Sequence, residues 1–161
     1  MITVLCGKVA AGKTALASRM QAEGAVVLSC DEMMLTLFDG CLGAAHDRTA
    51  MKCLHYLFSV AAQLAEKGLD AVIDYGFWLR AERDAARAYF AERSLPCRVL
   101  LVETAEDKRL SRLARRNDAL RSAEGRVYLI EGALLGRMDA KFEAPAPDEH
   151  IEHFDNTEDF I

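Results

Sequence analysis

Short apolar runs alternate with longer amphipathic segments along this chain. The first run is Ile2–Cys6, and similar runs occupy residues 25–29, 71–73, 98–102 and 151–154. Most of them are rich in Val, Leu or Ile, and glycine, proline or acidic residues flank them. Runs of this kind predict buried strands.

Between the runs, apolar residues recur every three or four positions, as they do on one face of a helix. Residues 47–67 form the longest predicted helix, which Gly68 is expected to end. Residues 32–46 include two expected turn positions, Gly40 and Gly43. Further helices are predicted over residues 14–23, 81–93, 105–117 and 125–138. Strands that alternate with helices predict an α/β fold, with a parallel sheet covered on both faces.

Length and composition indicate one globular domain, residues 1–161. No stretch approaches the roughly 20 apolar residues of a membrane span, and no targeting segment opens the chain, so we expect a cytoplasmic protein. Five cysteines without metal-ligand spacing are expected to be reduced core residues. Residues 143–161 hold seven acidic side chains and no Lys or Arg, which leaves a nearly neutral body. A nucleic-acid polymer is therefore a disfavoured partner.

A glycine-rich octapeptide directly follows the first predicted strand. It fits the pattern GxxxxGK[ST], in which backbone N–H groups surround phosphate, the lysine reaches the β- and γ-phosphates, and the hydroxyl binds Mg²⁺. The alternative is an ordinary βα turn that happens to contain glycines, but such a turn does not require Lys13 followed by Thr14. The residues expected to bind nucleotide here are Gly7, Lys8, Val9, Ala10, Ala11, Gly12, Lys13, Thr14 and Ala15.

Two aspartates follow predicted strands, where ligands of parallel sheets gather. Asp74 fits the role of a carboxylate beside the metal ion, and Thr14 is the second residue expected there. The alternative for Asp74 is that it caps the next turn. Asp31 fits the base that accepts a proton from an acceptor hydroxyl, and its alternative is an N-cap for a helix starting at Glu32.

Four arginines lie within eight residues of the predicted helix 105–117. Arg109, Arg112, Arg115 and Arg116 are these four, and at 3.6 residues per turn Arg109, Arg112 and Arg116 share one face, while Leu110, Leu113 and Ala114 point elsewhere. Such a ridge could close over a triphosphate and exclude water. The alternative is an ordinary solvated helix face.

Together these motifs resemble the small P-loop kinases related to polynucleotide kinase, zeta-type toxins and chloramphenicol phosphotransferase, which also appear as AAA-type ATP-binding proteins. The resemblance runs through the phosphate loop, residues 29–34 and 72–78, Arg80 and Arg83, residues 112–117 and residues 145–149. It implies a P-loop NTPase three-layer sandwich with a five-stranded parallel sheet in the order 2-3-1-4-5. It also implies a helical arginine lid, at about residues 105–140.

The resemblance implies roles for further residues. Asp31 would be the general base, with Lys13 also catalytic; Arg112 would stack on adenine and Arg116 contact phosphate, and Asn117 extends that match. Arg83 resembles a position that faces the acceptor. Polynucleotide kinases carry an arginine three residues after the catalytic aspartate, where this chain has Met34. Met34 and Phe77 are therefore expected in an apolar acceptor pocket, although such residues are more often core.

The sequence thus predicts an ATP- and Mg²⁺-dependent kinase that phosphorylates a hydroxyl of a small molecule. One alternative is a polynucleotide 5′-hydroxyl kinase, which Met34 and the acidic balance disfavour. Another is a nucleotide-binding switch or weak ATPase that recruits a protein partner.

Overall fold

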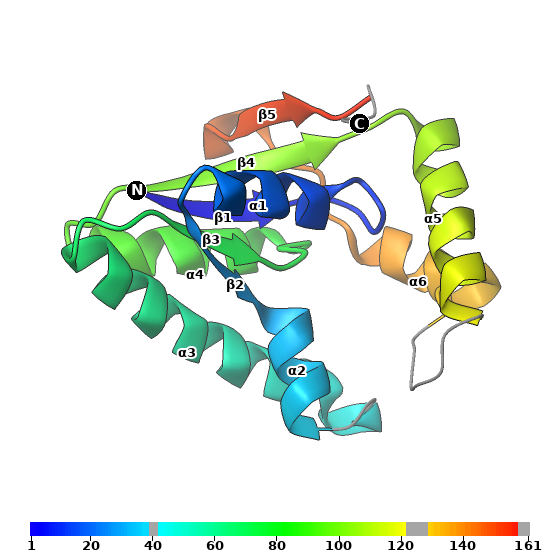
Figure 1. The fold of residues 1–161 in the computed structure, drawn as a ribbon, viewed down its shortest axis with the longest axis horizontal. Coiled ribbons are helices and arrows are strands. Elements are labelled where there is room, and N and C mark those ends of the chain that lie inside the picture. Colours follow the sequence, from blue (N-terminus) through cyan, green and yellow to red (C-terminus); the bar gives the residue numbers. More distant parts are fainter. Residues whose placement is uncertain (39–41, 122–128, 158–161) are drawn as a thin grey trace.

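Strands alternate with helices from one end of the molecule to the other (Figure 1). The computed structural model describes residues 1–38, 42–121 and 129–157. The strands are β1 (Ile2–Cys6), β2 (Val26–Ser29), β3 (Ala71–Asp74), β4 (Cys97–Glu103) and β5 (Glu152–Asp155). The α-helices are α1 (Lys13–Ala22), α2 (Cys30–Phe38), α3 (His46–Glu66), α4 (Arg80–Ala91), α5 (Glu106–Arg121) and α6 (Gly132–Lys141). Two short 3₁₀ helices are η1 (Gly43–Ala45) and η2 (Pro147–Glu149).

The five strands form one parallel sheet in the order β2-β3-β1-β4-β5, which confirms the expected topology. The register sets Leu5 of β1 beside Asp74 of β3, and Asp74 beside Ser29 of β2. The ends of β1, β2 and β3 are therefore adjacent, and the loops that follow them emerge at one edge of the sheet.

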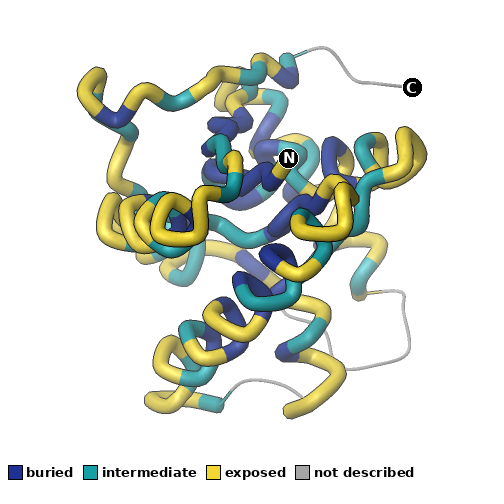
Figure 2. Tube along the Cα trace, turned by 90° about the vertical axis from the view of Figure 1, so that its left-hand side faces the viewer, coloured by how far each residue is buried: buried dark blue, intermediate teal, exposed yellow. Residues whose placement is uncertain are grey.

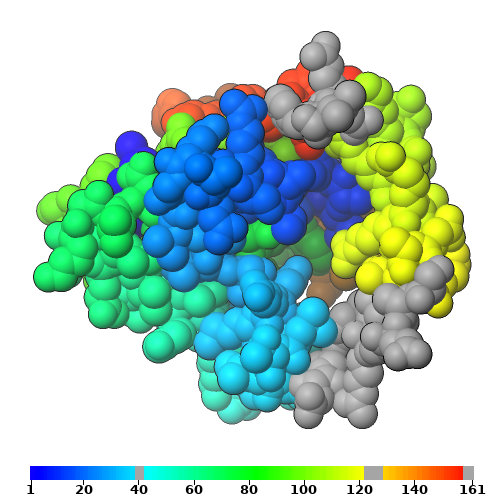
Figure 3. Space-filling model, in the orientation of Figure 1, coloured from blue at the N-terminus to red at the C-terminus, as the bar shows by residue number. Residues whose placement is uncertain are grey.

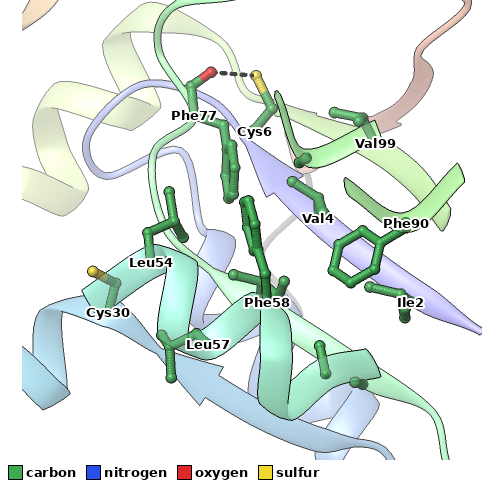
Figure 4. Packing of buried hydrophobic residues seen from close by; sticks show 14 of the residues in the cluster. Ile2, Val4, Cys6, Cys30, Leu54, Leu57, Phe58, Phe77, Phe90 and Val99 are labelled. Carbon is green, nitrogen blue, oxygen red and sulfur yellow. Dashed lines mark hydrogen bonds between the residues drawn. The ribbon is translucent and has the colours of Figure 1, made fainter. Parts of the chain in front are cut away.

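Helices cover the two faces of the sheet and make a three-layer sandwich. On one face α3 and α4 pack on β1, β3 and β4, with Phe58, Phe77 and Phe90 at the centre of the core (Figure 4). The rings of Phe58 and Phe77 stack with their centroids 6.3 Å apart. On the other face, Leu16 and Ala17 of α1 pack against strand side chains. All five residues of β1 are buried, as a central strand covered on both faces requires.

Helices α5 and α6 stand beyond the carboxyl ends of the strands (Figure 1). A third apolar cluster joins them to the first loop, because Val9 packs with Leu113 of α5 and with Ile130, which precedes α6. Along the other α-helices, buried residues alternate with exposed ones, as the tube view shows (Figure 2), whereas α6 has only intermediate and exposed residues. No helix within the described residues has both the length and the apolarity needed to cross a membrane.

The predicted elements agree with the structure apart from two. Helix α2 starts at Cys30 and extends into the 32–46 segment, where the sequence indicated a helix from Glu32 only as the alternative to a catalytic Asp31. The helix predicted over 125–138 begins only at Gly132, since residues 129–131 are not helical, and its expected start lies outside the described residues. The turn position expected at Gly40 also lies outside them, whereas Gly43 opens η1 with a φ of 54°.

Candidate functional site

The loop between β1 and α1 has the backbone of an anion-binding turn. Gly7, Ala10 and Gly12 have positive φ angles of 147°, 62° and 103°. Turns of this kind point successive N–H groups toward one place. The N-terminus of α1 adds partial positive charge, and no acidic residue in its first turn opposes it. A Cβ atom at Gly12 would also overlap the side-chain amide of Asn156, so this position needs glycine for its space as well as its φ.

Lys13 folds its side chain back over this loop. Its Nζ donates to the carbonyl oxygens of Gly7 at 2.9 Å and Lys8 at 2.8 Å. Burial lowers the pKa of Lys13, and the negative charges of Asp74 and Asp31 act in the opposite direction. The loop therefore holds a cation beside its own N–H groups, with two carboxylates near enough to act on its charge.

Thr14 and Asp74 meet across the edge of the sheet. The Thr14 hydroxyl donates to Oδ2 of Asp74 at 2.8 Å, and Asp74 is 7% exposed. Burial raises the pKa of Asp74, while the hydrogen bond from Thr14 acts to lower it. These are oxygen ligands of the kind that Mg²⁺ binds, and Mg²⁺ commonly takes only one or two protein ligands and completes its shell with water and phosphate. The described residues contain no cluster of three or more His, Cys, Asp or Glu side chains fit for a metal. The donor set thus fits a magnesium ion bound together with phosphate.

Asp31 lies in the first turn of α2, directly after β2, and its side chain is exposed. Ser29, not Asp31, caps the N-terminus of α2, because its Oγ accepts a hydrogen bond from the Glu32 N–H at 3.2 Å. Asp31 is therefore not needed as the N-cap. The charge of Asp31 acts on both Lys13 and Asp74.

Three residues expected to contact the acceptor are buried, which corrects that expectation. Met34 is 5% exposed and accepts a hydrogen bond from the Cys53 thiol. Phe77 and Arg83 are fully buried. Met34 and Phe77 belong to the core between the sheet and α3, so they form no pocket wall.

The Arg83 guanidinium is held inside the molecule. It donates to both carboxylate oxygens of Glu149 at 2.7 and 2.8 Å, and to the carbonyls of Phe77 and Trp78 at 3.1 and 3.2 Å. Sequence reasoning missed Glu149 as its partner because 66 residues separate the two, and no local pattern links them.

The arginines of α5 do not form one exposed ridge. Arg109 is 2% exposed and binds Glu106, Asp139 and the Val9 carbonyl, which fixes the phosphate loop to α5 and α6. Arg112 donates to the Thr104 hydroxyl at 3.2 Å and to the Asn156 carbonyl at 2.8 Å.

Arg116 is exposed, and its positive charge is among those that act on Lys13. Asn117 is buried and bonds the main chain of Ile130 in both directions, so it connects α5 to the segment before α6. This arrangement does not support the nucleotide contact expected of Asn117. Of the predicted α5 residues, Arg112 and Arg116 thus remain candidates for contact with nucleotide.

Asn156, which follows β5, is a further residue that sequence reasoning missed. It is 4% exposed, its Nδ2 donates to the Ala11 carbonyl at 3.0 Å, and its backbone N–H donates to Glu103. The space-filling view shows a hollow between α2 and α5, with the dark blue N-terminal residues along its upper side (Figure 3). A cavity of about 160 Å³ beside the loop is lined in part by two carboxylates, Glu103 and Glu106, and by two cations, Lys8 and Arg109.

The comparisons with known proteins agree with this geometry. A family model described as an AAA domain matches residues 2–145. The sequence matches none of the curated proteins.

Several solved structures share the fold. A sugar kinase from Janibacter sp. HTCC2649 has a TM-score of 0.63 and 21% identity, with 96% of this chain and 84% of that chain covered. Kti12 from Chaetomium thermophilum, in complex with ADP-AlF3, has a TM-score of 0.70 and 16% identity over 99% and 90%. The APS kinase CysC from Mycobacterium tuberculosis, in complex with AMPPNP and APS, has a TM-score of 0.63 and 20% identity over 96% and 87%. The fold is therefore that of the P-loop kinases.

Proposed function

The chain belongs to the AAA domain family, and on that premise we propose that it is an ATP-dependent phosphotransferase. It transfers the γ-phosphate of ATP to a hydroxyl group of a small molecule. The observation that carries the proposal is the meeting of Thr14 with Asp74, at 2.8 Å, beside Lys13 and within reach of the charge of Asp31. With the backbone of the phosphate loop as the cradle, Thr14 and Asp74 as the metal site, Lys13 as the cation and Asp31 as the base, the needs of phosphoryl transfer are covered.

The phosphate loop binds the triphosphate. Backbone N–H groups of residues 7–15 surround the β- and γ-phosphates, and Lys13 exchanges its carbonyl contacts for phosphate oxygens. Thr14 and Asp74 would hold Mg²⁺, Asp74 directly or through water. When bound, that ion neutralises charge on the β- and γ-oxygens.

Asp31 is the general base of the proposed reaction. It accepts the proton of the acceptor hydroxyl while the acceptor oxygen bonds to the γ-phosphorus, and the bond from that phosphorus to the bridging oxygen breaks to release ADP. Arg112 and Arg116 extend the cationic side of the site from α5, where Arg116 already acts on Lys13. A movement of α5 toward α2 would exclude water that otherwise hydrolyses ATP.

Two observations favour a small acceptor over a nucleic-acid polymer. The body of the chain is nearly neutral and its C-terminal residues are acidic, so no broad basic surface is available for a phosphate backbone. Met34, at the position where polynucleotide kinases carry an arginine, is buried in the core. The similar structures include proteins named as a sugar kinase and an APS kinase, which makes hydroxyl-bearing metabolites the first class to screen.

The test combines an acceptor screen with a matched pair of variants. ADP release is measured with Mg²⁺ and ATP against polyols, sugars, nucleoside derivatives and hydroxyl-bearing antibiotics. With the best acceptor, Asp31→Asn is expected to lower transfer by about 10²-fold or more, the usual scale of general-base loss, and to keep ATP affinity. Glu32→Gln, on the exposed neighbouring residue, is expected to change neither. Equal transfer by Asp31→Asn and the wild type would remove Asp31 from the role.

A further inference from the structure

The single tryptophan of the chain contacts the phosphate loop directly. The indole Nε1 of Trp78 donates to the carbonyl oxygen of Gly7 at 3.1 Å, and the Gly7 N–H donates to the Gly76 carbonyl at 3.1 Å. The segment that follows β3 therefore fixes both backbone polar groups of the first residue of the loop. We propose that Trp78 is a positioning residue for the phosphate loop, and that the buried Arg83–Glu149 pair holds Trp78 in place. The inference rests on the proposed use of ATP.

The Gly7 carbonyl accepts hydrogen bonds from two side chains, those of Lys13 and Trp78. Only the bond from Trp78 is compatible with bound nucleotide. Lys13 donates to this oxygen at 2.9 Å, and the triphosphate draws the lysine away toward the phosphates. Gly7 is buried, and a buried carbonyl that loses its donor is destabilised. The Trp78 indole remains on the Gly7 carbonyl, so the loop keeps its shape while Lys13 changes partners.

The Trp78 segment has a conformation that needs support. Phe77 has a φ of 44°, in the left-handed region that a bulky residue rarely adopts. The indole folds back over Gly76 so closely that a Cβ atom there would overlap the ring. Strained backbone of this kind persists only where surrounding contacts fix it.

Arg83 supplies those contacts. Its Nη1 donates to the carbonyls of Phe77 and Trp78, and the backbone N–H of Glu143 adds a second donor to Trp78 at 2.9 Å. Glu149 fixes Arg83 from the opposite side through two hydrogen bonds, and itself accepts the backbone N–H of Ala146 at 3.0 Å. Both side chains of this pair are at most 1% exposed. Glu149 lies beyond residues 2–145, the part that the family model matches.

The neighbouring pair Arg80–Asp148 provides a matched control. It also joins α4 to η2, with Nη2 of Arg80 2.6 Å from Oδ2 of Asp148, but both of its side chains are exposed. Asp148→Asn weakens the ion pair with Arg80, and Glu149→Gln weakens the pair with Arg83 and a longer contact with Arg87 at 3.7 Å, so both variants loosen the attachment of η2 to α4. Only Glu149→Gln touches the path to the phosphate loop.

The experiment measures Mg·ATP affinity by calorimetry, at a temperature well below the melting point of every variant. Trp78→Phe keeps an aromatic ring and removes the donor, and we expect its Kd for ATP to rise roughly 3- to 10-fold, the scale of one neutral hydrogen bond. Glu149→Gln is expected to weaken binding in the same direction by a smaller factor, and Asp148→Asn to bind as the wild type does. Because Glu149 acts through Trp78, the double variant should bind no more weakly than Trp78→Phe alone.

The outcomes separate the two proposals. Wild-type affinity in both Trp78→Phe and Glu149→Gln would overturn the positioning role, as would single-variant losses that multiply in the double variant. Equal losses in Asp148→Asn and Glu149→Gln would also overturn it, because they would reflect the stability of α4 and η2 in general. No ATP binding by the wild type would instead overturn the proposed function, and the inference with it.

Discussion

At the scale of single residues, the arginines show what the chain can and cannot reveal about its chemistry. Arg83 and Arg109 were expected to face an acceptor or to line a ridge, yet each is buried against carboxylates. Their partners Glu149 and Asp139 lie 66 and 30 residues further along the chain. A guanidinium looks the same in sequence whether it will bind phosphate or a buried carboxylate, so only the fold separates the two uses.

The Thr14–Asp74 contact could be anticipated, because each residue stands at a defined place after a strand. The register of β1 with β3 places their ends side by side, and the loop after β1 returns to the start of α1, where Thr14 meets Asp74. Asp31 was likewise expected at a neighbouring strand end. The structure adds that Ser29 caps α2, so the Asp31 carboxylate is not used as the N-cap.

Asp74→Asn is expected to separate stability from activity. The pKa of Asp74 is raised, so its contribution to stability is fully present below the ordinary value of 3.8 and is lost as the pH rises through the folded-state value. Asparagine avoids that loss and still accepts the Thr14 hydroxyl. Without Mg²⁺ and ATP at pH 7, the variant should melt roughly 2–4 °C higher, the shift that about 1 kcal/mol produces in a domain of this size. Its transfer activity should fall roughly 10- to 100-fold.

Differential scanning calorimetry at two pH values checks the stability half of this prediction. Near pH 3 the difference in Tm between Asp74→Asn and the wild type should shrink toward zero, since both side chains are then neutral. A variant that melts below the wild type at pH 7 would contradict the assigned desolvation of Asp74.

At the scale of elements, the strands were predictable and two of the helices were less so. Short, mostly apolar runs specify four of the strands locally, and the fifth lies where Ile151 and Phe154 alternate with polar residues. Helix α2 was weakly marked because its apolar residues are spread around the helix, with Leu35, Leu37 and Phe38 exposed and Met34 buried. Helix α6 has no buried residue within its described length, so tertiary contacts rather than a strong local pattern set where it begins.

Helix α5 offers a test of the cationic side of the site. Arg115 and Arg116 are adjacent and exposed, and the charge of Arg116 is among those that act on Lys13. Arg116→Ala is expected to raise the KM for ATP or lower kcat, with a total loss in kcat/KM of roughly 10- to 100-fold, the scale of a hydrogen bond to a charged group.

Steady-state kinetics of Arg115→Ala provide the comparison for Arg116→Ala. That change also removes an exposed arginine from α5, and it should leave kcat/KM within about twofold of the wild type. Equal losses in the two variants would mean that only the net charge of α5 matters, and the specific role of Arg116 would be withdrawn.

At the scale of the whole molecule, strand order depends on pairings that no local pattern contains. The order 2-3-1-4-5 could be expected only through resemblance to known kinases, and the register confirms it. The C-terminal contacts had no such guide. Glu149 acts through Arg83 at one end of the phosphate loop, and Asn156 bonds Ala11 near the other, although both lie beyond the part that the family model matches.

The buried Arg83–Glu149 pair should give the fold a specific dependence on pH. The Arg83 guanidinium lowers the pKa of Glu149 from 4.5 to about 2. The ionised Glu149 side chain therefore contributes fully to stability above pH 4.5, and this contribution is lost as the pH falls through about 2. In urea unfolding, the free-energy difference between the wild type and Glu149→Gln should stay constant above that window and narrow within it. A difference that stays constant down to pH 2 would argue against an ionised Glu149 in the folded state.

The central claim is that residues 7–15 bind a nucleoside triphosphate with a metal held by Thr14 and Asp74. Calorimetric titration of the wild type and Lys13→Ala with ATP, in the presence and absence of Mg²⁺, tests it most directly. The account predicts saturable one-to-one binding that Mg²⁺ strengthens and that Lys13→Ala weakens by roughly 10-fold or more, as expected for a charge-assisted contact. An absence of binding by the wild type, with ATP and GTP alike and with Mg²⁺ present, would contradict it.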